Sequence, residues 1–295
     1  MLSSHRELVV RLSRLGFVHL VGIPLGLLLS IVLGRIIGPE GFGQYTFTMA
    51  FVSLAAIPVL GWMPRLLTRE FAADSINARW THFNGLRKFA DRWAFFASIS
   101  VIAVAGIGLY LWGNFESARL RLIVLGFALI PIYGFNAARN GLLRGLGKPV
   151  LAELPNQVLS PTLALSALLV LSSLTVLTPE IAILVQILVG LALLIYYQLV
   201  TAAVTPGAAR ARAGELDRKP VLRSLLPFLV VGFIGTLNAR IALVILGFIS
   251  TDESVAALRV GERGAQMVAL PLALINVVIA PRIVEHFQQS DMPGL

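Results

Sequence analysis

The chain alternates long apolar runs with short polar connections. A helix needs about 20 largely uncharged residues to cross the hydrocarbon core of a bilayer, and five runs reach that length: residues 15–34, 41–64, 93–113, 154–179 and 181–209. Three weaker runs complete the set: 122–138 is short, 224–251 contains Arg240, and 254–281 carries charges near its start. The pattern predicts an all-α fold, a polytopic membrane bundle of about eight transmembrane helices.

Composition supports this prediction. The sequence is 57% hydrophobic and 13% charged, with a mean hydropathy of +0.84, which is too apolar for a water-soluble domain. The net charge of +9 comes from basic clusters between the apolar runs, where they would neighbour anionic lipid headgroups rather than nucleic acid. No small-residue cleavage site follows the basic N-terminus, so the first run is interpreted as a retained helix.

The positions of the basic residues predict an orientation. If the eight helices alternate in direction, most of the 24 Lys and Arg residues fall on one side, in the N-terminal segment and in the connections at 65–92, 139–148 and 210–223. The other side holds Arg35, Arg119 and Arg121. Because basic loops stay cytoplasmic, the N-terminus is predicted to be cytoplasmic in a bacterial inner membrane.

An internal repeat predicts the domain organisation. Leu33, Gly34, Glu40 and Pro58 match Leu246, Gly247, Glu253 and Pro271 at a constant offset of 213 positions. Residues 1–204 would then form a six-helix half, 205–220 a basic cytoplasmic linker, and 221–295 the first two helices of a second half. On this interpretation the polypeptide is a truncated product; the alternative is that the repeat is illusory.

Proline residues lie inside five of the apolar runs: Pro24, Pro58, Pro131, Pro161 and Pro271. Proline removes a helical hydrogen bond and bends the helix. A packing kink explains any single site, whereas five bent spans together favour a transporter that flexes over an inert anchor.

Three arginines within predicted helices are the candidate site. Arg240 lies about 24 Å along its helix at 1.5 Å per residue, where a charge costs at least about 2.5 kcal/mol and should face a cavity. It could bind an anion, snorkel to the headgroups, or pair with Glu253 or Glu262. Arg259 and Arg263 are spaced i, i+4 and share a helix face.

Other chemistry finds little support in the sequence. The four histidines are scattered, cysteine is absent, and no phosphate-binding glycine loop is present, so neither a metal, a cofactor nor catalysis is expected. Only Glu153 and Glu262 among the acidic residues fall within spans, and both lie near the ends, where they are poorly placed for proton or sodium coupling. A cationic cavity of this kind suits an anionic, phosphate-bearing substrate.

Several motifs resemble one family. The stretch 33–45 (LGRIIGPEGFGQY), the stretch 63–70 (MPRLLTRE), the connection 143–149 (LRGLGKP) and Ala280-Pro281-Arg282 are similar to those of the polysaccharide flippases, which include the O-antigen flippases of the multidrug/oligosaccharidyl-lipid/polysaccharide exporter superfamily. The resemblance implies twelve to fourteen helices in two pseudo-symmetric halves. Arg35 aligns with a basic residue that related lipid II flippases also carry at the end of the first helix.

The resemblance also implies a function and partners. Such proteins move undecaprenyl-diphosphate-linked oligosaccharides from the cytoplasmic to the periplasmic leaflet by alternating access, so Arg240, Arg259, Arg263 and Arg35 are the expected substrate-binding residues. The expected partners are this polyprenyl diphosphate substrate, membrane lipids, and glycan polymerase or assembly proteins, with no nucleic acid. Two alternatives stay open: a multidrug or ion-coupled exporter of the same superfamily, and a non-transporting truncated membrane protein.

Overall fold

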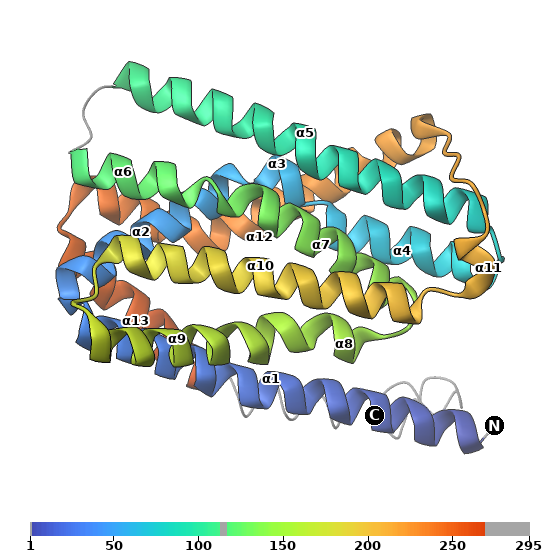
Figure 1. Cartoon of the computed structure of the whole chain (residues 1–295), viewed down its shortest axis with the longest axis horizontal. Coiled ribbons are helices and arrows are strands. Elements are labelled where there is room, and N and C mark those ends of the chain that lie inside the picture. The colour runs from blue at the N-terminus through green and yellow to red at the C-terminus, as the bar shows by residue number, and fades with distance from the viewer. Residues whose placement is uncertain (1, 113–116, 269–295) are drawn as a thin grey trace, which may run out of the picture.

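The computed structural model describes residues 2–112 and 117–268, and every regular element in that part of the chain is a helix. The elements are α1 (Leu2–Ile36), α2 (Gly38–Ala55), α3 (Ile57–Leu60), α4 (Met63–Ile76), α5 (Trp80–Trp112), α6 (Ser117–Gly126), α7 (Leu129–Gly145), α8 (Pro149–Leu154), the π-helix η1 (Pro155–Leu159), α9 (Ser160–Leu174), α10 (Pro179–Val204), α11 (Gly207–Arg210), α12 (Arg218–Ile249) and α13 (Asp252–Val268). The long helices run roughly side by side as one bundle (Figure 1).

The predicted polytopic bundle is confirmed. Within the described residues, six helical segments are long and apolar enough to cross a membrane. The number rises to seven if the bent pair 38–55 and 57–76 is counted as one further span. The eighth predicted run, 254–281, begins as α13, and its part beyond Val268 lies outside the described residues.

Some helices begin or end at other residues than predicted, because a proline or a capping residue determines the boundary. The run predicted at 154–179 is helical from Pro149 to Leu174. Pro179 instead starts α10, where Thr178 is the N-cap and its hydroxyl accepts from the Ile181 N–H. Proline suits the first turn of a helix, because the N–H that it lacks would have no partner there.

The long basic connection predicted around residues 65–92 is also helical. α4 and α5 occupy most of it and meet at a tight corner where Ala78 has a positive φ of 52°. Arg139 and Arg144, assigned above to the next connection, lie inside α7, and Arg139 is only 4% exposed. The prediction that these two arginines are loop residues is therefore wrong, because α7 continues to Gly145 beyond its apolar part.

Three of these prolines lie beside irregular helix geometry, and at Pro58 the predicted bend is present. Pro58 follows the break between α2 and α3, across which the helical axis turns by 51°. Pro161 follows the π-helix η1, and Pro131 follows the junction between α6 and α7. Pro24 lies within the continuous helix α1, and Pro271 lies outside the described residues.

Close backbone contacts hold α12 and α13 against α2 and α3. A side chain at Gly43 of α2 would collide with the backbone of Asp252, at the start of α13. One at Gly232 of α12 would collide with the carbonyl of Gly61, just after α3. Only glycine allows approaches this close, so these two positions determine how closely α12 and α13 pack on the earlier helices in this conformation.

The segment between α10 and α12 is fastened to the corner between α4 and α5. The Asn84 side-chain amide donates to the carbonyls of Ala209 and Arg212 at 2.6 and 2.9 Å, and the Glu215 N–H donates to the Thr81 carbonyl at 3.2 Å. In Figure 1 this corner, α11 and the start of α1 lie at the same end of the bundle, which we call the linker end.

Candidate functional site

A cavity of about 720 Å³ lies between the earlier helices and α12 and α13. Its walls come from α1, α2, α7, the η1–α9 segment, α10, α12 and α13, with one residue each from α3 and α4. These segments are distant in the sequence, so only the packing of the bundle creates the cavity.

Arginines form the charged part of the cavity lining. Arg240 of α12 and Arg259 and Arg263 of α13 all line it, as predicted from their intramembrane positions. The predicted gathering of these arginines around a common space is therefore present in the structure.

The three guanidinium groups differ in their partners. Arg259 donates to Glu262 at 3.0 Å, and Arg263 donates to Gln266 at 2.9 Å while lying against Gly26 of α1. Arg240 makes no hydrogen bond or ion pair with any residue that the structure describes. The expected alternative of an Arg240 pair with Glu253 or Glu262 is thus not seen, and its donors are available to a ligand.

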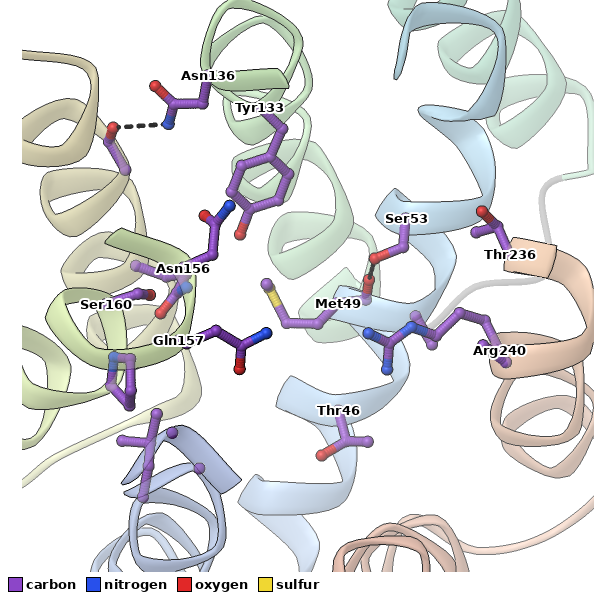
Figure 2. A pocket seen from close by; sticks show the side chains of 18 of the residues that line it. Thr46, Met49, Ser53, Tyr133, Asn136, Asn156, Gln157, Ser160, Thr236 and Arg240 are labelled. Atoms are coloured by element: carbon purple, nitrogen blue, oxygen red, sulfur yellow. Dashed lines mark hydrogen bonds between the residues drawn. The ribbon is translucent and has the colours of Figure 1, made fainter. Parts of the chain in front are cut away.

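Arg240 reaches into the cavity from one wall. Figure 2 shows its guanidinium directed toward Met49 on α2, with Gln157 directed toward the same space from the opposite wall. Arg240 lies nine residues before the end of α12, about 13 Å by helical rise, so the charge is well within the span.

Two arginines behave differently from the predictions. Arg35 is exposed at the end of α1 and is not among the described residues that line the cavity. Arg144, which sequence reasoning treated as a topology signal, lines the cavity and forms an ion pair with Glu153. Arg144 lies just beyond an apolar run, where arginines are usually topology signals. That it lines the cavity follows only from the way α7 packs against the other helices.

Amide side chains form a second polar group in the lining, which sequence reasoning missed. The members are Asn136, Asn140, Asn156, Gln157 and Gln186. Asn136 donates to the Gly190 carbonyl at 3.1 Å, but its buried side-chain carbonyl has no partner among the described residues. The i, i+4 spacing of Asn136 and Asn140, at the end of the apolar run 122–138, is the signal in the sequence that could have identified this group.

Carboxylates near the cavity are neutralised. Glu153 accepts from Arg144 and Asn140, and Glu262 accepts from Arg259. No carboxylate occurs among the described lining residues, whereas four arginines do. The cavity is therefore cationic. Within the described residues, no group of three or more His, Cys, Asp or Glu side chains is placed to hold a metal ion.

Comparison with known proteins identifies a family. A family model described as polysaccharide biosynthesis protein matches residues 12–287, nearly the whole chain. No curated protein and no solved structure matches the chain.

Proposed function

The chain belongs to the polysaccharide biosynthesis protein family, the family of O-antigen and polysaccharide flippases, and on this premise we propose that it flips an undecaprenyl-diphosphate-linked oligosaccharide across the bacterial inner membrane. Members of this family are transporters rather than enzymes. The proposed direction is from the cytoplasmic to the periplasmic leaflet, with the N-terminus cytoplasmic.

The observation that carries this proposal is the cationic cavity. Four arginines and no carboxylate line it among the described residues, and Arg240 has no partner of its own there. An unpaired guanidinium within a membrane span is costly unless it serves a ligand or meets water. A diphosphate offers the oxygen pairs that a guanidinium binds through two parallel hydrogen bonds.

The amide group supports the glycan part of the proposed substrate. Asn and Gln side chains both donate and accept hydrogen bonds, as sugar hydroxyls do. Asn156 and Gln157 face the cavity opposite Arg240 (Figure 2). The arginines would hold the diphosphate while the amides replace part of the water that surrounds the sugars, which lowers the cost of carrying a polar headgroup through the membrane.

The helix ends support the proposed division into two halves. At the repeat offset of 213, the end of α1 at Ile36 corresponds to the end of α12 at Ile249, and the start of α2 at Gly38 falls one residue before Asp252, the start of α13. We propose that residues 1–204 and the region from 221 onward move relative to each other, with 205–220 as the linker, so that the cavity faces one leaflet at a time.

A deletion strain that lacks its own flippase tests the proposal. Expression of this chain should restore display of at least one cell-surface glycan, measured by glycan gel and surface labelling. Failure with every glycan in a representative panel, at normal protein level in the membrane, would contradict it. Efflux of cationic dyes driven by an ion gradient, without glycan display, would identify a drug exporter instead.

A further inference from the structure

A second hollow, which the proposed function does not use, lies on the outer surface of α5. It has a volume of about 1000 Å³ and is lined by one stripe of α5 together with parts of α3, the linker and α12. We call it the α5 groove; its lining residues are Pro58, Gly85, Lys88, Phe89, Arg92, Trp93, Phe96, Ala97, Ser100, Val101, Gly214, Leu216 and Leu222.

The α5 groove is apolar along most of its length. Phe89 and Trp93 are half-buried in it, and Phe96 is 63% exposed. The Trp93 indole N–H donates to the Pro58 carbonyl at 3.1 Å, so the ring is held in place and its polar atom is already satisfied. A wall of this kind provides apolar surface for a hydrocarbon chain.

Two cations lie at the end of the groove nearest the linker. Lys88 and Arg92 are spaced i, i+4 on α5, both are exposed, and neither makes a hydrogen bond or ion pair with a described residue. No carboxylate is found among the described lining residues. Glu215 is close in sequence to Gly214 and Leu216, but it lines a separate hollow that also contains Arg79 and Arg212.

The dimensions fit one leaflet of a bilayer. Arg92 and Val101 are 9 positions apart, which is roughly 14 Å along a helix, and the hydrocarbon of one leaflet is roughly 15 Å thick. With Arg92 at headgroup level and Lys88 one turn further out, Trp93, Phe96 and Val101 lie at the depth of the acyl chains. A charged end followed by an apolar stretch complements an anionic lipid.

We propose that the α5 groove is a binding site for an anionic phospholipid, with the phosphate at Lys88 and Arg92 and an acyl chain along Trp93, Phe96 and Val101. The linker residues Gly214 and Leu216 form one wall. A lipid in the groove therefore joins α5 to the segment that connects the proposed halves. This inference is independent of the substrate of the central cavity.

Lipid titration of the purified full chain in detergent, followed by native mass spectrometry, tests the charged end. We expect tighter binding of phosphatidylglycerol than of phosphatidylcholine. The double variant Lys88→Gln/Arg92→Gln should weaken phosphatidylglycerol binding roughly tenfold or more, because each cation near a phosphate contributes appreciably, while phosphatidylcholine binding should stay unchanged. The matched control is Arg65→Gln/Lys148→Gln, which removes two exposed cations outside the groove and should leave the preference intact.

A second pair of variants tests the apolar part without changing charge. Ser100→Phe places a ring in the groove and should lower phosphatidylglycerol binding. Ser166→Phe alters an equally exposed serine on α9, whose hydroxyl likewise bonds to a carbonyl of its own helix, and should not. Equal loss in the control variants, or an unchanged lipid preference in the Lys88/Arg92 variant, would overturn the proposal. So would displacement of phosphatidylglycerol by equimolar polyprenyl phosphate, which would assign the groove to the carrier lipid.

Discussion

Individual charged residues in this chain have different roles that depend on their partners. Arg139 and Asp91 form a pair at 2.8 Å in which the arginine is almost fully buried, and such a pair holds α7 to α5. Arg259 is matched by Glu262. Arg240 has neither kind of partner among the described residues, so it is the arginine whose removal should affect transport most and folding least.

Replacement of Arg240 by alanine tests this distinction. Arg240→Ala should lower the rate of glycan display roughly 10- to 100-fold, the effect of losing one or two hydrogen bonds to a charged group, with a normal amount of protein in the membrane. Arg35→Ala is the matched control, because Arg35 is an exposed arginine outside the cavity lining, and it should retain display. Unchanged display in Arg240→Ala, or equal loss in both variants, would contradict the assignment.

At the scale of helices, glycine contacts decide how closely α12 and α13 approach the earlier helices. Lipid tails are as apolar as the side chains of the helices, so the hydrophobic effect does not drive helices together in a membrane. Helix packing there depends instead on close contact between small residues. Gly232 meets the Gly61 carbonyl just after α3, about one helical turn beyond the break between α2 and α3. The break lies within the first proposed half, and the glycine contact next to it joins that half to α12.

A bulky residue at this contact should separate the helices. Gly232→Leu must displace the backbone at Gly61, and overpacking of a core costs about 1–3 kcal/mol, so we expect a lower melting temperature of the purified protein and reduced display. Gly106→Leu provides the comparison, since Gly106 of α5 has open space around it. A Gly232→Leu protein as stable as the Gly106→Leu protein would show that the contact is unimportant.

For the whole molecule, an interaction between distant segments bridges the end opposite the linker. Arg119 of α6 donates to the Asp252 carboxylate at 2.8 Å and to the Gly247 carbonyl at 3.1 Å. This joins the first proposed half to the turn between α12 and α13. Alternating access would require this connection to open and close.

Cross-linking tests that requirement, and the absence of native cysteines makes the experiment simple. In the Arg119→Cys/Asp252→Cys variant, a short cleavable thiol cross-linker should abolish glycan display, and reduction should restore it. Each single-cysteine variant, treated in the same way, should stay active. Normal display by fully cross-linked protein would exclude motion at this end as part of transport.

The membrane bundle, most of its spans and the arginines within them could be predicted from the amino-acid sequence, because long apolar runs and the charges inside them are local properties of the chain. The sequence could not determine that Arg139 is buried in a pair, that Arg144 lines the cavity while Arg35 does not, or that five amides face the same space. Those outcomes depend on which helix faces contact each other. The contacts are determined by glycine approaches, proline breaks and buried ion pairs between segments that are distant in the sequence. Tertiary packing therefore brings four arginines to one cavity. Among these four, Arg240 is the one that makes no hydrogen bond or ion pair with a described residue.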